Sequence, residues 1–120
     1  MTQTARLRDI EANELNELIR DNKPVLVELW ASWCGPCKAM LPVLETLAEE
    51  FSGQLDIVKL EIFNPEMPGN DDWAKLFGVR SVPTFILFDR GTDIAGFAGL
   101  AGQGEMKAWL TKHLGGAEAG

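Results

Sequence analysis

Two cysteines, Cys34 and Cys37, are the residues in this chain whose type and spacing point most directly to chemistry. They are the chain's only cysteines, so a scaffold of several structural disulfides is excluded. A structural zinc site within one subunit is excluded as well, because it needs more ligands than this pair and His113, the sole histidine, can supply. The pair can therefore do redox chemistry, bind a metal shared between two chains, or lie inert in a core.

A strand and a helix are expected on either side of the cysteine pair. The segment Val25–Trp30 is apolar except for Glu28, which is the pattern of a strand covered on both faces. From Gly35 to Phe51, apolar residues recur at intervals of three and four, which predicts a helix that Pro42 should kink. The pair then lies at a junction between strand and helix.

This junction suits a reactive thiol. Cys34 would lie over the free N–H groups of the first helical turn, which stabilise a thiolate, and Pro36 fits that turn because it lacks an N–H. Cys37 lies one turn further on, within reach of a disulfide bond. We expect an exposed Cys34 to attack a substrate disulfide and Cys37 to resolve the mixed disulfide that forms.

The remaining segments predict an alternating order of strands and helices. We expect a weak first strand at Thr4–Arg8, a helix at Asp9–Arg20, a strand at Leu55–Ile62, a short helix capped by Asn70 or Asp71 and ended by Gly78, a hairpin of two strands at Pro83–Phe88 and Thr92–Ala98, and a helix at Gln103–Leu114. This order predicts an α/β fold with a central mixed sheet of four to five strands and helices on both faces.

Length and composition bound the functional classes. A chain of 120 residues is one domain, which we place at residues 1–114 with a flexible tail at 115–120. The net charge of −7 argues against nucleic-acid binding, and the apolar runs are too short to cross a membrane. The first ten residues lack the apolar stretch of a signal peptide. We expect a cytoplasmic monomer.

Further motifs identify a family. Residues 30–38 read Trp-Ala-Ser-Trp-Cys-Gly-Pro-Cys-Lys, and they are followed by Pro42, Lys59, the run Val82-Pro83-Thr84 and Gly99. This set resembles the thioredoxin family from about residue 5 to residue 114. The resemblance implies the thioredoxin fold and protein-disulfide reductase activity, with no bound cofactor. It also implies that electrons come indirectly from NADPH through a thioredoxin reductase, and that disulfide-containing proteins are the substrates.

The resemblance also implies roles for the residues around the pair. Glu28 is the one acid in an otherwise apolar strand, so we expect burial to raise its pKa. By resemblance it stands where the family usually carries a buried aspartate, so it would accept the Cys37 proton. Lys59 in the neighbouring strand would pair with Glu28 and tune it. Pro83 would be cis and face the disulfide. The substrate-binding residues, which we call the docking surface, would be Trp33, Gly35, Pro36, Val82 and Gly99.

One segment departs from the family pattern. An acidic residue and a short connection usually follow the third strand, but this chain has Phe63 and a loop about five residues longer, Asn64 to Asp72. We expect this loop to lie beside Trp33, to extend the docking surface and to narrow the set of partners.

Other functions stay open at this point. A protein of this fold could bind partners independently of redox turnover, or could exchange disulfides with a narrow range of substrates. An oxidant or isomerase would need an oxidising compartment, and Gly35-Pro36 together with the missing signal peptide argue against it. A metal-bridged dimer through Cys34 and Cys37 is the remaining alternative.

Overall fold

The structure of the protein, a computed structural model, describes residues 7–21 and 23–115. The expected tail beyond Gly115, and the first part of the strand expected at Thr4–Arg8, lie outside these residues. Among the helices that the structure describes, none has the length and apolar character that crossing a membrane requires.

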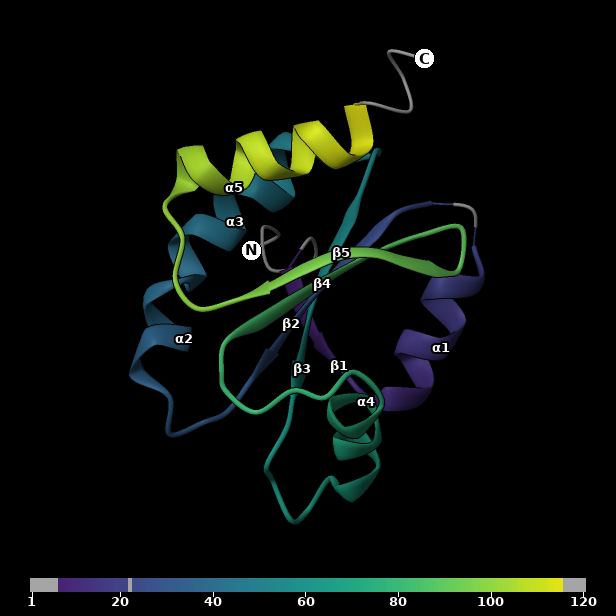
Figure 1. The fold of residues 1–120 in the computed structure, drawn as a ribbon, viewed down its shortest axis with the longest axis vertical. Helices are drawn as coiled ribbons and strands as arrows, with labels where there is room; N and C mark the ends of the chain where they lie inside the picture. Colours follow the sequence, from purple (N-terminus) through teal and green to yellow (C-terminus); the bar gives the residue numbers. More distant parts are fainter. Residues whose placement is uncertain (1–6, 22, 116–120) are drawn as a thin grey trace.

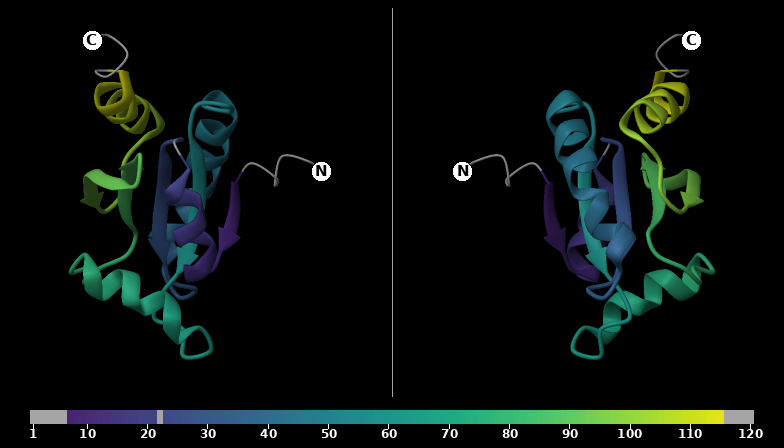
Figure 2. Two further views of the ribbon diagram at one scale, coloured as in Figure 1. Left: turned by 90° about the vertical axis from the view of Figure 1, so that its right-hand side faces the viewer. Right: turned by 90° about the vertical axis from the view of Figure 1, so that its left-hand side faces the viewer.

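A five-stranded mixed sheet forms the centre of the fold, as the sequence predicted (Figure 1). Its strands, in the order β1-β3-β2-β4-β5, are β1 (Leu7–Ile10), β3 (Asp56–Glu61), β2 (Val25–Trp30), β4 (Thr84–Asp89) and β5 (Thr92–Ala98). Strands β1, β3 and β2 are parallel, whereas β4 runs antiparallel to both β2 and β5. Figure 2 shows β1 and β5 at opposite edges of this sheet.

Helices cover both faces of the sheet. Helix α3 (Leu41–Glu50) and helix α5 (Gln103–Leu110) pack on one face, around the buried side chains of Leu26, Ile57 and Phe85. Helices α1 (Ala12–Arg20) and α4 (Asp71–Leu76) pack on the other face, around Val27, Leu60 and Ile86. The buried side chains of the two faces alternate along the strands, as expected in a sheet that is covered on both faces.

The N-terminal boundary differs from the prediction. Residues 9 and 10, expected in a helix, belong to β1, because Leu7 to Ile10 pair in parallel with Ile57 to Leu60 of β3. The helix begins at Ala12 instead, where the side chain of Glu14 accepts a hydrogen bond from the Glu11 N–H at 3.2 Å. Backbone pairing with β3 therefore prevails over the amphipathic pattern that suggested an earlier helix start.

The long helix expected from Gly35 to Phe51 is interrupted rather than only kinked. Helix α2 (Gly35–Ala39) ends before Met40, and α3 begins at Leu41. Pro42 lies in the first turn of α3, where its missing N–H costs no hydrogen bond. The proline thus begins a second helix.

The connection after β3 contains a short 3₁₀ turn, η2 (Pro68–Asn70), before α4. Asn70 is the N-cap residue of α4, as predicted, but its side chain makes no capping hydrogen bond, because the side chains of Asn70 and Asp71 both bind elsewhere. Asn70 accepts from the Ala12 N–H and donates to the Glu61 carbonyl, each at 2.9 Å, while Asp71 accepts from the Phe63 N–H at 2.8 Å. Both residues therefore fasten the long connection to the rest of the fold.

The C-terminal half follows the prediction closely. Strands β4 and β5 form the expected hairpin, and Gly78, with a φ of 65°, lies just beyond the end of α4. Helix α5 ends at Leu110 and continues as a π-helical turn, η3 (Thr111–Gly115). The expected helix at Gln103–Leu114 is therefore correct in extent but changes its winding at Thr111.

Candidate active site

The chain directions within the sheet bring three segments to one end. Strands β2 and β4 are antiparallel, so Leu29 near the end of β2 pairs with Thr84 at the start of β4. Thr84 in turn pairs with Ala98 at the end of β5. The segments that follow β2, precede β4 and follow β5 therefore meet, and they carry the cysteine pair, Pro83 and Gly99 respectively.

The cysteine pair is a disulfide at the start of α2. The α-carbons of Cys34 and Cys37 are 5.3 Å apart, and Cys34 is the residue that precedes the helix. Its Sγ accepts a hydrogen bond from the Cys37 N–H at 3.1 Å. A negative charge on Cys34 would gain from this donor and from the positive end of the short helix, because both favour an anionic sulfur.

Burial of Cys34 corrects one expectation. In the disulfide form, Cys34 is only 3% exposed and Cys37 only 2% exposed, so exposure does not distinguish an attacking from a resolving cysteine. The two pack in one cluster with Ala31, and Trp30 and Val82 lie against it. What distinguishes the cysteines is the hydrogen bond, because Cys34 holds the sulfur that accepts it.

The docking surface surrounds this disulfide. Trp33 is 67% exposed, and Gly35 and Pro36 are exposed beside it. The peptide bond between Val82 and Pro83 is cis. The Gly99 N–H donates to the Pro83 carbonyl at 2.8 Å, and Gly99 has a φ of 102°, which other residue types rarely adopt. Val82 packs against the cluster that contains the disulfide, and Gly99 is hydrogen-bonded to Pro83, the residue after Val82.

Glu28 lies under the site on the central strand. It is 1% exposed, and its Oε2 has no hydrogen-bond partner among the described residues. It pairs in register with Lys59 of β3 and with Phe85 of β4. Burial raises the pKa of Glu28 from 4.5 to about 8. The positive charge of Lys59 lowers this pKa, and the negative charge of Asp9 raises it. Glu28 is therefore mostly protonated at neutral pH.

Lys59 has a different ion-pair partner from the expected one. Its Nζ lies 3.7 Å from Asp9 Oδ2 and 4.7 Å from the centre of the Trp30 ring, whose Nε1 donates to Asp9 Oδ1 at 3.1 Å. Lys59 acts on Glu28 through its charge. Asp9 was missed as a site residue, since its position opposite Lys59 follows only from the parallel register of β1 and β3.

Phe63, at the start of the long connection, was not among the predicted site residues. Its ring stacks on Trp33, with centroids 6.2 Å apart and planes inclined by 12°. This contact places Phe63, the residue before the loop Asn64 to Asp72, beside Trp33. The sequence signal was present in the departure of Phe63 from the family pattern, but stacking with Trp33 depends on the packed positions of two separate loops.

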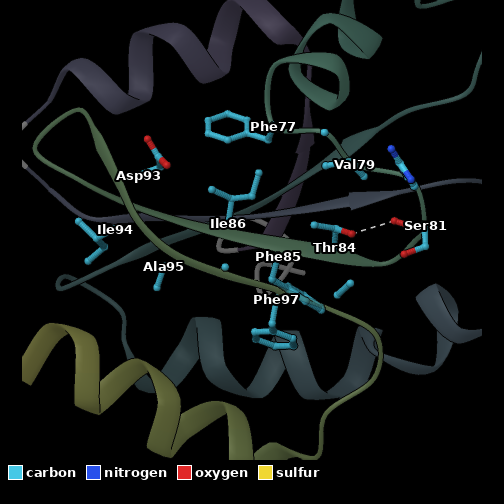
Figure 3. Close-up of a pocket in the computed structure, with 14 residues that line it drawn as sticks. Phe77, Val79, Ser81, Thr84, Phe85, Ile86, Asp93, Ile94, Ala95 and Phe97 are labelled. Atoms are coloured by element: carbon cyan, nitrogen blue, oxygen red, sulfur yellow. Dashed lines mark hydrogen bonds between the residues drawn. The ribbon is translucent and has the colours of Figure 1, made fainter.

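A hollow of about 520 Å³ runs along β4 and β5 next to the docking surface (Figure 3). Its lining includes Phe77, Val79, Ser81, Ile86 and Ile94, which come from the segment after α4 and from the hairpin. Thr84 Oγ1 donates to the Ser81 carbonyl at 2.8 Å, as Figure 3 shows. This bond fixes the segment that leads to Val82.

Metal binding has no support in the side chains that the structure describes. Within residues 7–21 and 23–115, no group of three or more histidine, cysteine, aspartate or glutamate residues is placed to hold an ion.

Comparisons with known proteins agree on one family. The family model described as Thioredoxin matches residues 7–112. A thioredoxin of Mycobacterium tuberculosis (strain CDC 1551 / Oshkosh) is 39% identical over 113 residues, which cover 93% of this chain and 89% of the relative. A thioredoxin of Haemophilus influenzae is 32% identical over 114 residues, or 95% of this chain and 100% of the relative.

Two further relatives extend the comparison. A protein of Mycobacterium leprae named bifunctional thioredoxin reductase/thioredoxin is 42% identical over 97 residues, which are 80% of this chain but only 20% of that longer protein. Among solved structures, a mutant thioredoxin from Halobacterium salinarum NRC-1 has a TM-score of 0.78 and 31% identity, with 91% of each chain covered.

Proposed function

The chain belongs to the thioredoxin family and is a thiol-disulfide oxidoreductase, and we propose that Cys34 is its nucleophile, Cys37 its resolving cysteine and Glu28 the proton acceptor. The hydrogen bond from the Cys37 N–H to Cys34 Sγ carries this assignment. It places at Cys34 the donor that stabilises an attacking thiolate and, later, a leaving thiolate.

The reaction has two displacement steps. The Cys34 thiolate attacks one sulfur of a substrate disulfide, so that a Cys34–substrate bond forms while the other substrate sulfur leaves as a thiolate. In molecules whose Glu28 is ionised, Cys37 then loses its proton to the Glu28 carboxylate and attacks Cys34, which releases the second substrate thiolate. The two cysteines lose two electrons as they form the disulfide, and the substrate disulfide gains these electrons and is reduced to two thiols.

The raised pKa suits Glu28 to this transfer. An ordinary carboxylate is a much weaker base than a thiolate, whose conjugate acid has a pKa of about 8.5. With a pKa of about 8, Glu28 nearly matches the thiol, so the proton can pass in either direction at low cost. We propose that Lys59 tunes this value, since its charge keeps the pKa from rising further.

The docking surface supports binding of an extended substrate segment. We propose that the backbone of Val82 pairs with this segment as a strand would, while Trp33, Gly35, Pro36 and Gly99 line it and Pro83 faces the disulfide. The contact of Val82 with the disulfide cluster and the bond between Gly99 and Pro83 support this arrangement.

The source of electrons is also a proposal. We propose that a thioredoxin reductase returns the disulfide to the dithiol with electrons from NADPH, and that no cofactor is bound. The Mycobacterium leprae relative, whose name joins a reductase to a thioredoxin, supports this partner. The proposed substrates are disulfide-containing proteins, and the net charge of −7 argues against nucleic acid as a partner.

We further propose that residues 1–114 act as a single domain, as a monomer in the cytoplasm. One sheet with a helical layer on each face supports a single domain. A reducing compartment fits a protein that must be returned to its dithiol form after each cycle.

A coupled assay tests the function. Oxidation of NADPH is followed with a thioredoxin reductase and a disulfide-bonded test protein, with and without this protein. We expect sustained turnover that Cys34→Ser abolishes, and we expect Cys37→Ser to accumulate a mixed disulfide detectable by its added mass. A double variant, Cys34→Ser with Cys37→Ser, that retained all biological function would contradict the proposal and favour a binding module.

A further inference from the structure

A small pocket lies between Phe63 and the segment that leads to Val82. It has a volume of about 220 Å³, and its lining is mostly apolar. The lining includes the apolar Phe63, Ala74 and Val79 and the charged Asp71, Lys75 and Arg80. Pockets for small-molecule ligands usually measure about 300–1,000 Å³, so this one has room for a single side chain rather than a cofactor.

The Phe63 wall of this pocket is held in place from two sides. Phe63 has a φ of 61°, a conformation that bulky residues rarely adopt. Its N–H donates to Asp71 Oδ1 at 2.8 Å, and its ring stacks on Trp33. The backbone of the preceding residue is also anchored, since the Ile62 N–H donates to the Trp30 carbonyl at 2.7 Å.

The opposite wall is also fixed before any partner binds. The Val79 N–H donates to the Ala74 carbonyl at 2.8 Å, at the point where the chain leaves α4. Further along, Thr84 Oγ1 donates a hydrogen bond to the Ser81 carbonyl (Figure 3). The segment from Val79 to Ser81, which leads to Val82, is therefore hydrogen-bonded at both ends. The pocket is thus built from two anchored segments, which limits the ordering that a bound side chain must cause.

The pocket is continuous with the docking surface. Phe63 adjoins it through Trp33, and Val79 and Arg80 adjoin it through the short segment that leads to Val82. An extended substrate segment that pairs with Val82 and presents its disulfide to Cys34 would carry a neighbouring side chain across this pocket.

We propose that Phe63 is a specificity-determining residue whose pocket receives an apolar side chain of the substrate protein, close in sequence to the cysteine that Cys34 attacks. Asp71, which also lines the pocket, is then a positioning residue that holds the backbone of Phe63. Although 41% of Phe63 is exposed to solvent, a side chain in the pocket would cover its ring together with Val79. This inference rests on the proposed function, because it names the substrate feature that the same site selects.

Matched peptides test the inference. Disulfide-bonded peptides carry either Leu or Ser at one of the three positions on each side of the cysteine, and kcat/KM is measured for each. A difference of one apolar group in a protein pocket changes kcat/KM by about 10-fold or more, so we expect the Leu peptide to be preferred by at least about 10-fold at one position. We expect Phe63→Ala to reduce this preference to less than about twofold.

Control variants separate the pocket from general apolar surface. Leu76 is 70% exposed and belongs to α4, but it is not part of the pocket lining, so Leu76→Ala should keep the Leu preference. Asp71→Ala should weaken the preference, whereas Asp71→Asn retains an oxygen that can accept from the Phe63 N–H and should restore it.

A small aromatic disulfide without neighbouring side chains serves as the reference substrate. If it is reduced normally while the wild-type protein treats Leu and Ser peptides alike, or if Phe63→Ala keeps the preference, the inference is wrong and the proposed function stands. If the reference substrate is not reduced either, the proposed function fails and the inference fails with it.

Discussion

Replacing Glu28 by Gln removes a buried acid whose charge the folded protein tolerates poorly. Burial raises the pKa of Glu28 from 4.5 to about 8. A carboxyl with a raised pKa in the folded state contributes its stability below about pH 4.5, and this contribution is lost as the pH rises toward 8. The unfolded chain loses the Glu28 proton first, so alkaline conditions favour unfolding of the wild-type protein relative to the variant.

The magnitude follows from the two pKa values. Each pKa unit corresponds to about 1.4 kcal/mol, so the wild-type protein should lose about 2–3 kcal/mol relative to Glu28→Gln between pH 5 and pH 7. A further loss of about 1 kcal/mol should follow by pH 9, where both states are ionised and the difference levels off. The Gln side chain does not titrate, so its own burial adds only a constant difference.

Urea unfolding of the oxidised protein at pH 5, 7 and 9 measures this difference, because the disulfide removes the thiols from the titration. Glu45→Gln, which removes an exposed carboxyl from α3, corrects for the loss of one charge. A difference between wild type and Glu28→Gln that stayed within about 0.5 kcal/mol over this pH range, well below the change expected from linkage, would refute the reasoning.

The same variant tests the catalytic role. If Glu28 accepts the Cys37 proton, Glu28→Gln should slow release of the second substrate thiol in a single turnover by about 10²-fold, at the low end of general acid–base contributions. The wild-type rate should rise with pH up to about 8, as Glu28 becomes ionised, and the variant should lose this dependence. Equal rates at pH 7 would remove Glu28 from the mechanism.

Other changes have separate readouts. Lys59→Met removes the charge that lowers the pKa of Glu28, so the midpoint of the thiol-release profile should move to higher pH, while Lys59→Arg should leave it in place. Gly96→Ala would place a Cβ 2.8 Å from the Phe85 carbonyl oxygen, and urea unfolding should show a loss of about 1–3 kcal/mol. Gly104→Ala in α5 meets no atom within 4 Å and should stabilise the protein by about 0.5–1 kcal/mol in the same assay.

Local patterns made much of the site predictable. The strand Val25–Trp30 was predicted with its observed bounds, because Pro24 precedes it and an unbroken apolar pattern defines it. The start of the following helix at Gly35 was predicted because Pro36 fits only its first turn. The position of Glu28 in this strand was enough to predict its burial and its raised pKa.

Long-range contacts account for what was missed. The burial of Cys34 depends on packing by Ala31 and Val82, which belong to different loops. The side chains of Asn70 and Asp71 looked like helix caps, but each binds a backbone group in another segment. The sequence pattern contains no information on these partners until the loops are placed.

The position of β2 has a consequence for how this protein can change over time. It is hydrogen-bonded to β3 on one side and to β4 on the other, and it carries Glu28 directly and the cysteine pair at its end. The connection from Phe63 to Asp71 starts beyond the end of β3 and contributes no strand to the sheet. On the proposed role of Phe63, insertions there would alter which proteins are recognised without altering the spacing of acid and sulfur. Exchanging this connection between relatives would then change substrate choice while retaining the redox centre.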